Sequence, residues 1–176
     1  MKRSRFFVIM LWCVAATALA QPSFRGNGDE IKREDFPVER DRTPVNATFS
    51  FAIFSDLHVC DTLPQNLDDL QRAIDEVNER ADLAFVLVCG DVTHHGDTKS
   101  LRLAKQMLDG LRIPYYVVPG NHDMRVSESG AVDFARIFGD NHFRLFFNGY
   151  LFLGVNSSPV LRRNDAHVAP QEVAWL

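Results

Sequence analysis

Three short segments of the sequence contain residue types that can bind a metal ion and transfer a proton. Each segment directly follows an apolar run, and they read Asp56-Leu57-His58, Gly90-Asp91 and Gly120-Asn121-His122-Asp123. The two segment-to-segment intervals, Asp56 to Asp91 and Asp91 to Asn121, are 35 and 30 positions. Each interval has the length of one strand–helix–strand unit. The spacing therefore favours one site assembled from three distant segments.

The side chains in these segments suggest metal chemistry. Two carboxylates held together repel each other and raise the pKa of one of them, and a bound cation removes that conflict. Carboxylate, amide and imidazole ligands without a thiolate suit Zn, Mn, Fe or a pair of such ions. In Asp-x-His, alternate residues of an extended segment point the same way, so Asp56 and His58 are expected to face one ion. Two ions can activate water and assist displacement at phosphorus.

The elements that must position these segments follow from the hydrophobic pattern. Short apolar runs predict strands at 49–54, 83–88 and 113–118, and helical spacing predicts amphipathic helices at 65–80 and 98–110. This β-α-β-α-β order predicts a parallel sheet covered by helices. Parallel strands end at the same edge, where open α/β sheets bind ligands. All three polar segments are therefore expected at that edge.

The pattern changes after residue 128. A short helix is predicted at 131–138, and strands at 143–147 and 151–155 flank Asn148-Gly149, a hairpin turn signal. Residues 170–176 resemble the start of another helix. We expect the apolar side chains of the two strands to leave an exposed face and a strand edge, which predicts an aggregation-prone chain. Those side chains are Phe143, Leu145, Phe147, Leu151, Leu153 and Val155.

The first 20 residues have the pattern of a secretory signal peptide. A basic head precedes an apolar run over 6–20, which ends in Ala18-Leu19-Ala20, a typical cleavage site. The run is shorter than the ~20 residues that span a bilayer, so no membrane span is expected after cleavage. The sequence thus predicts an exported protein, periplasmic or secreted. Residues 21–47 are polar and irregular and predict a linker or disordered arm, followed by a domain over 48–176.

Charge and cysteine content limit the partners and the covalent framework. Removal of three basic residues with the leader would take the formal charge from −4 to −7. An acidic chain without a basic run is not expected to bind a nucleic-acid backbone. Cys60 and Cys89 would remain, and they could form a disulfide or be two unpaired small side chains.

The three motifs, taken in order and spacing, resemble the metallophosphoesterase superfamily, the calcineurin-like phosphoesterases. The resemblance implies a layered α-β-β-α sandwich, here incomplete, whose parallel half is the β-α-β-α-β unit. It implies two divalent or trivalent ions, Mn, Fe or Zn, and a small-molecule phosphoester substrate. The chain looks most like secreted members of the cyclic-nucleotide-phosphodiesterase and purple-acid-phosphatase types.

The resemblance also implies roles for individual residues. Asp56 and His58 would bind the first ion, Asp91 would bridge both ions, and Asn121 would bind the second ion. His122 would contact the phosphate and protonate the leaving oxygen. The implied reaction is hydrolysis of phosphate mono- or diesters by a metal-activated hydroxide.

The sequence departs from the family pattern in two places. The family carries a further His and then Gly-His-x-His, whereas His142 and His167 lack that context, so the chain resembles an N-terminal portion of a longer enzyme. Protein-phosphatase-like members have an Asp that orients the catalytic His. His94 stands there instead, so a Ser/Thr protein phosphatase is not expected.

Two alternatives to a catalytic phosphoesterase are kept, and four further histidines are assigned outside the motifs. The chain could be a non-catalytic fragment with at most one weak metal site, or a secreted binding module that retains the fold. His94 and His95 are interpreted as loop residues within possible reach of substrate. His142 and His167 are predicted to face solvent.

Overall fold

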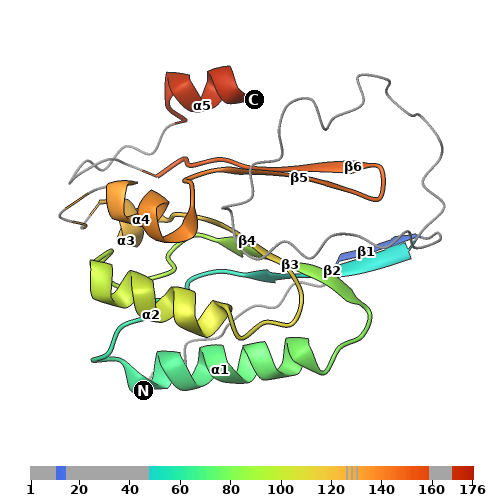
Figure 1. The fold of residues 1–176 in the computed structure, drawn as a ribbon, viewed down its shortest axis with the longest axis horizontal. Helices are drawn as coiled ribbons and strands as arrows, with labels where there is room; N and C mark the ends of the chain where they lie inside the picture. Colours follow the sequence, from blue (N-terminus) through green and yellow to red (C-terminus); the bar gives the residue numbers. More distant parts are fainter. Residues whose placement is uncertain (1–10, 15–47, 126, 128, 130, 159–167) are drawn as a thin grey trace.

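A four-stranded sheet carries the predicted site in the computed structural model, which describes residues 11–14, 48–125, 127, 129, 131–158 and 168–176. The strand order is β1 (Leu11–Val14), β2 (Thr48–Phe54), β3 (Leu83–Cys89) and β4 (Tyr115–Val118). β2, β3 and β4 are parallel neighbours. Helices α1 (Pro64–Asn78) and α2 (Thr98–Leu108) connect them, so the predicted β-α-β-α-β unit is confirmed (Figure 1).

β1 was not predicted as a strand. Leu11–Val14 lies in the apolar run interpreted as a signal peptide, and in the structure it pairs antiparallel with β2, with Leu11 opposite Phe51. The remainder of the predicted leader and the polar arm at 21–47 lie outside the described residues. Within the described part of the chain, no helix is long and apolar enough to cross a membrane.

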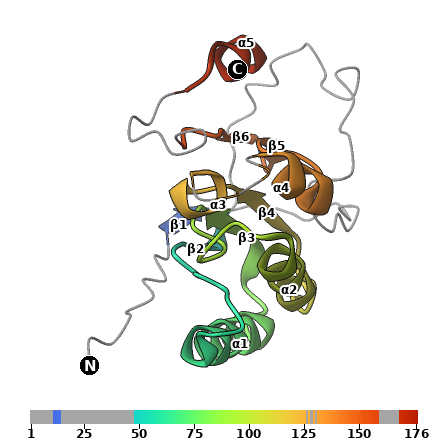
Figure 2. The same cartoon turned by 90° about the vertical axis from the view of Figure 1, so that its left-hand side faces the viewer.

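The two connecting helices cover one face of the sheet (Figure 2). α1 begins with Pro64 at its first turn and buries Leu70, Ile74 and Val77. α2 begins after Asp97, whose side chain accepts a hydrogen bond from the Ser100 N–H at 2.9 Å. The apolar stripes of both helices pack on sheet residues such as Val86 to form the larger core.

A hairpin covers the opposite face of the sheet. Strands β5 (Phe143–Phe147) and β6 (Tyr150–Gly154) lie over an aromatic layer of the sheet (Figure 1). In that layer the rings of Phe51 and Phe85 stack at 5.0 Å between centroids. The turn residues Asn148 and Gly149 have φ of 51° and 82°, the left-handed pair that a two-residue hairpin turn requires. The sheet therefore lies between helices and a second strand layer.

The hairpin carries apolar side chains on both of its sides. The register pairs Leu145 with Phe152 on the side that faces the sheet and Phe146 with Leu151 on the other side. Because strand side chains alternate, the outer side carries Phe146, Leu151 and Leu153, which are exposed by 50%, 51% and 40%. The apolar side chains of the two strands are thus divided between the core and solvent.

Two short helices and a terminal helix complete the described fold. α3 (Asn121–Met124) follows β4, and α4 (Ala131–Phe138) contacts α2. α5 (Pro170–Trp175) lies beyond the hairpin, where the Arg144 Nη2 donates to the Trp175 carbonyl at 2.8 Å. His142 was predicted to face solvent, but it is half-buried, and its Nδ1 lies 3.2 Å from Glu172 Oε1. His167 lies outside the described residues.

Candidate metal centre

The three polar segments meet at the carboxyl ends of β2, β3 and β4. Asp56 and His58 follow β2, Asp91 follows β3, and Asn121 begins α3 directly after β4. Main-chain hydrogen bonds connect the first two loops: the Asp56 N–H donates to Gly90 O at 3.2 Å, and the His58 N–H donates to Asp91 O at 2.9 Å. The sheet edge therefore gathers the segments as the strand order predicts.

The candidate ligand residues have unusual backbone torsions. Asp56, His58 and Asp91 have φ of 57°, 46° and 48°, in the left-handed region. The only other described non-glycine residue with positive φ is Asn148. Left-handed torsion costs a typical residue roughly 1–2 kcal/mol, although Asp, Asn and His tolerate it better than most. Asp56 and His58 are therefore not alternate residues of an extended segment, and the extended geometry expected from Asp-x-His is wrong.

Two glycines allow the second and third loops to approach each other. A Cβ on Gly120 would lie 2.1 Å from Asp91 N and 2.2 Å from Asp91 Oδ1, which no side chain can occupy. Gly120 itself has an ordinary extended backbone, with φ of −104°. Gly90 has φ of 82°, and its added Cβ would lie 2.9 Å from Gly120 Cα. Gly120 is therefore required for space next to Asp91 rather than for turning the chain.

The side chains of the first two loops form a compact cluster of acceptors. His58 Nε2 lies 3.8 Å from Asp56 Oδ1 and 4.0 Å from Asp91 Oδ2. One ligand atom from each of the three residues lies within 4.8 Å of the others. Asp91 is largely buried at its side chain, and its other oxygen accepts the His122 main-chain N–H at 2.8 Å. Two carboxylates and one imidazole at these distances match the requirements of a single cation.

Asn121 lies beside this cluster on the wall of the same cavity. The cavity has a volume of about 430 Å³, and its lining includes Asp56, Asp91 and Asn121. Ser157 and Ser158, just after β6, also line it, so the second strand layer contributes to the site. Cys89 lines the cavity as well; it and Cys60 are both free, so the two thiols do not form a disulfide here.

His122 is held in one orientation by the loop after β3. Its Nδ1 lies 2.8 Å from the His94 carbonyl oxygen. Since a carbonyl oxygen only accepts hydrogen bonds, Nδ1 carries the proton. Nε2 is then the nitrogen that can exchange a proton or bind a metal ion. The ring lies 4.6 Å from the His58 ring, measured between centroids. The structure thus brings His122 to the ligand cluster.

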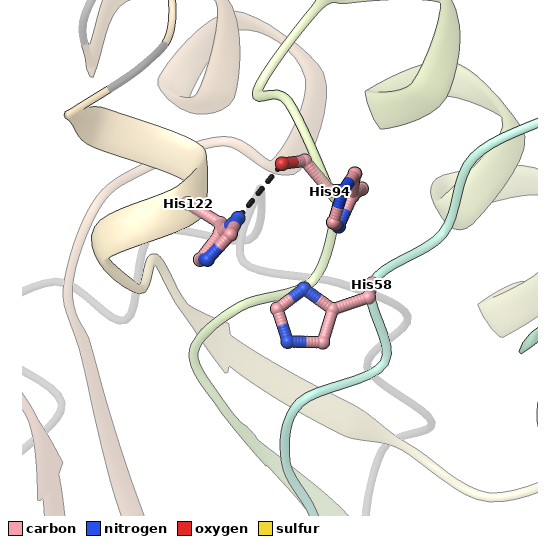
Figure 3. A group of neighbouring side chains, drawn as sticks. All are labelled: His58, His94 and His122. Carbon is pink, nitrogen blue, oxygen red and sulfur yellow. Dashed lines mark hydrogen bonds between the residues drawn. The ribbon is translucent and has the colours of Figure 1, made fainter. Parts of the chain in front are cut away.

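His94 is closer to the site than its interpretation as a loop residue implied. His58, His94 and His122 each offer a ring nitrogen within 4.8 Å of the others (Figure 3). Burial lowers the pKa of His94, and the neighbouring His95, His122 and His58 lower it further. The sequence signal was the His94-His95 pair three residues after Asp91, which spacing alone could not distinguish from an ordinary loop.

Asp123, the last residue of the third motif, was given no individual role by the sequence, but it connects two loops of the site. Its fully buried carboxylate accepts four hydrogen bonds, from the N–H groups of Val92, Thr93 and Gly120 and from the Thr93 hydroxyl, at 2.7–3.0 Å. Burial raises the pKa of Asp123, and these hydrogen bonds oppose that shift. The carboxylate therefore fixes the loop after β3 to the loop after β4.

The residues present fit one metal ion well and a second ion in part. Asp56, His58 and Asp91 supply a mixed oxygen and nitrogen donor set, and His58 Nδ1 is buried without a hydrogen-bond partner among the described residues. For a second ion, the predicted ligands at the cavity are Asp91 and Asn121. Carboxylate and imidazole donors suit Zn, Mn or Fe alike, so the donor set does not select one of them.

The family model of the calcineurin-like phosphoesterases matches residues 49–168. Relatives include a "Probable cyclic nucleotide phosphodiesterase" of Rhodopseudomonas palustris, 40% identical over 57 residues, which are 32% of this chain and 21% of that protein. A "Probable glycerophosphodiester phosphodiesterase GpdQ" of Arcobacter nitrofigilis is 33% identical, with 58% of this chain and 38% of that protein covered.

A third relative is named as a protein phosphatase rather than as a phosphodiesterase. The "Serine/threonine-protein phosphatase CPPED1" of Bos taurus is 28% identical over 120 residues, which are 58% of this chain and 37% of that protein. The chain therefore spans well under half the length of these three relatives.

Proposed function

The chain belongs to the calcineurin-like phosphoesterase family, a family of hydrolases, and from this premise we propose that the protein hydrolyses phosphate mono- or diesters at a centre of two metal ions. The observation that carries the proposal is the convergence of Asp56, His58 and Asp91 in left-handed conformations at the end of the sheet. Strained torsions on candidate ligands are expected where function, rather than stability, selects the residue.

We assign the ligands as follows. Asp56 and His58 would hold the first ion, Asn121 would hold the second ion, and Asp91 would serve both. When bound, two ions would lower the pKa of a water so that hydroxide attacks phosphorus, and they would neutralise the developing charge. The main-chain N–H of His122 holds one Asp91 oxygen, which orients the other toward His58.

His122 acts on the leaving group in this proposal. The His94 carbonyl keeps a proton on Nδ1, so a cationic His122 carries its second proton on Nε2. As the bond from phosphorus to the leaving oxygen breaks, that oxygen takes the Nε2 proton. The proton that the attacking water gives up in becoming hydroxide passes to solvent before the attack. The neutral imidazole is then reprotonated from solvent.

The names of the relatives suggest the substrate class. Two of them are named as phosphodiesterases, one for cyclic nucleotides and one for glycerophosphodiesters. Small phosphodiesters are therefore the substrates we propose to assay first. The open cavity and its polar lining from Asn121, Ser157 and Ser158 are compatible with such a ligand. A protein phosphatase remains disfavoured in our interpretation, because the position that carries an orienting Asp in that branch is His94.

The decisive experiment compares two Asp-to-Asn variants with Mn²⁺ as the metal and bis(p-nitrophenyl) phosphate as substrate. Asp91→Asn should lower kcat by about 100-fold or more, since it removes charge at the point where charge develops. Asp82→Asn is the matched control, because Asp82 is exposed and paired with Arg80 away from the site. Equal rates for wild type and Asp91→Asn would exclude the mechanism.

A second candidate function is a chain that binds one ion without turnover. Among the described residues, two groups could hold a metal ion, and only the group of Asp56, His58 and Asp91 contains carboxylates. A single carboxylate-containing group favours one bound ion. Calorimetric titration of the 176-residue chain with Mn²⁺ distinguishes the two. One site and no hydrolysis support this candidate, whereas two tight sites with hydrolysis exclude it.

We further propose that the protein is exported. The basic head, the apolar run over 6–20 and Ala18-Leu19-Ala20 support cleavage before Gln21. Expression in a secretion-competent host followed by N-terminal sequencing tests this directly. Gln21 as the first residue is expected, and an intact Met1 on the mature protein would contradict export by this route.

A further inference from the structure

Three imidazoles from three different loops lie together beside the carboxylate cluster. His58 follows β2, His94 follows β3 and His122 belongs to α3. Measured between ring centroids, His58 lies 4.6 Å from His122 and 5.5 Å from His94, and His94 lies 5.3 Å from His122. All three residues are half-buried, and their rings lie close together (Figure 3). We call this group the histidine triangle.

The ring nitrogens of His58 belong to two different groups. Nε2 lies near the oxygens of Asp56 and Asp91. Nδ1 is buried, and no described residue hydrogen-bonds it; the same holds for His94 Nδ1. Buried polar atoms usually have a hydrogen-bond partner, so two ring nitrogens without one in the same cluster are candidates to bind a ligand. A neutral imidazole has one free lone pair, so His58 can serve the carboxylate cluster through Nε2 or the histidine triangle through Nδ1, but not both at once while it keeps its ring proton.

The hydrogen bond of His122 is compatible with metal binding. Metal-binding histidines usually donate one ring N–H to a carbonyl or carboxylate, which fixes the tautomer. The bond from His122 Nδ1 to the His94 carbonyl is of this type and leaves the Nε2 lone pair free. Because the acceptor is main chain, this bond does not depend on the His94 side chain.

The donor sets of the two groups differ in chemistry. Asp56, His58 and Asp91 bring oxygen-rich, anionic ligands, which accept Mn²⁺ as well as Zn²⁺. The histidine triangle brings only neutral nitrogen, which favours Zn²⁺, Cu²⁺ or Ni²⁺ over Mn²⁺ or Mg²⁺. The nearby Asp91 carboxylate, 4.0 Å from His58 Nε2, adds negative charge that attracts a cation.

We propose that the histidine triangle is a separate, inhibitory site for a borderline divalent cation such as Zn²⁺, Cu²⁺ or Ni²⁺. An ion at this site would be bound by His122, which is the proton donor of the proposed reaction, and by His58, which also belongs to the catalytic centre. The inhibitory consequence rests on the proposed function. The binding site itself does not, because it follows from the three imidazoles alone.

The binding test uses Cu²⁺ and a chain in which Asp56→Asn and Asp91→Asn disable the carboxylate cluster. Calorimetry should still give one Cu²⁺ per chain, and electron paramagnetic resonance should show coupling to imidazole nitrogen. Adding His94→Ala should weaken Cu²⁺ binding by at least ~10-fold, the range seen when groups that support a metal are lost. His95→Ala is the matched control, because His95 is the exposed neighbour outside the triangle.

Two outcomes would overturn the site. One is loss of Cu²⁺ binding when only the carboxylate cluster is disabled, and the other is equal Cu²⁺ affinity for the His94→Ala and His95→Ala chains. Circular dichroism checks folding, and His94→Gln replaces His94→Ala if the latter does not fold. The glutamine variant keeps the side-chain bulk but lacks the imidazole, so the same loss of affinity is expected.

The inhibition test uses the Mn²⁺-loaded chain and a phosphodiester assay. Added Zn²⁺ should inhibit the wild-type chain, and His94→Ala should raise the inhibitory Zn²⁺ concentration by at least ~10-fold relative to its own uninhibited rate. Unchanged inhibition would contradict the inhibitory role. A chain with no hydrolysis under any metal would instead count against the proposed function, while the Cu²⁺ titration would still decide the site.

Discussion

Left-handed backbone in the hairpin turn and in the site loops has different consequences. In the hairpin turn it falls on Asn148 and Gly149, and in the site loops it falls on Asp56, His58 and Asp91. The turn needs the torsion itself, so any residue that tolerates it can serve. The site loops combine the torsion with side chains that are candidate metal ligands. The same local conformation therefore affects stability in the turn, and in the site loops it also fixes where the candidate ligands lie.

The largest contrast is expected between two glycines. Gly120→Ala should destabilise the chain by about 4 kcal/mol, because the added Cβ would lie 2.1 Å from Asp91 N and the loops must separate. Gly149→Ala in the hairpin should cost only about 1–2 kcal/mol, the cost of left-handed torsion. Urea denaturation of both variants measures this. Similar losses would show that the close approach of the two site loops is not tightly required.

Asp123 tests whether the site region depends on buried polar contacts more than the hairpin region does. Asp123→Asn should cost about 3 kcal/mol, since the amide NH₂ would face hydrogen-bond donors and leave some unpaired. Asp140→Asn, just before the hairpin, should change stability by less than about 0.5 kcal/mol, because its carboxylate is half-exposed. Thermal unfolding monitored by circular dichroism compares them. Equal stability of the two variants would contradict the role assigned to Asp123.

Asp56 and Asn148 provide a matched pair of substitutions to glycine. Asp56→Gly should lower Mn²⁺ affinity by about 10–100-fold while changing stability by less than about 1 kcal/mol, because glycine adopts the torsion freely but offers no ligand. Asn148→Gly should leave Mn²⁺ affinity unchanged. Calorimetric titration gives both affinities. If Asp56→Gly retains full affinity, Asp56 is not a ligand.

The smallest effect on stability is expected on the outer face of the hairpin. Leu151→Thr should change the free energy of unfolding by less than about 0.5 kcal/mol, because the side chain is already half-exposed. It should nevertheless reduce aggregation, since it interrupts the apolar surface of Phe146, Leu151 and Leu153. Light scattering over time is the measurement. A wild-type chain that remains monomeric and melts cooperatively would refute the expected aggregation.

The sequence was sufficient to predict the parallel β-α-β-α-β half of the fold and the order of its elements. Strong periodicity predicted helices at 65–80 and 98–110, which the structure places at Pro64–Asn78 and Thr98–Leu108. The carboxyl ends of the parallel strands then brought Asp56, His58 and Asp91 together. These features depend on local pattern and on the geometry of parallel sheets, both of which can be read from one chain.

Other features depend on contacts between loops, which no local pattern contains. The His94 ring and the Asp123 carboxylate each contact a segment about 30 residues away, at His122 and Thr93 respectively. The reason for Gly120 was likewise hidden, because the atom it avoids belongs to Asp91. β1 was missed because the same apolar residues also fit a leader sequence.

The Asp123 carboxylate has a consequence for the exchange of backbone hydrogens with solvent. Three amides, those of Val92, Thr93 and Gly120, share this one acceptor although they belong to two different loops. An opening motion that exposes one of them must detach the others from the same carboxylate. Their exchange should therefore be correlated and report a single cooperative opening of the site edge, whereas amides in independent loops would exchange at unrelated rates.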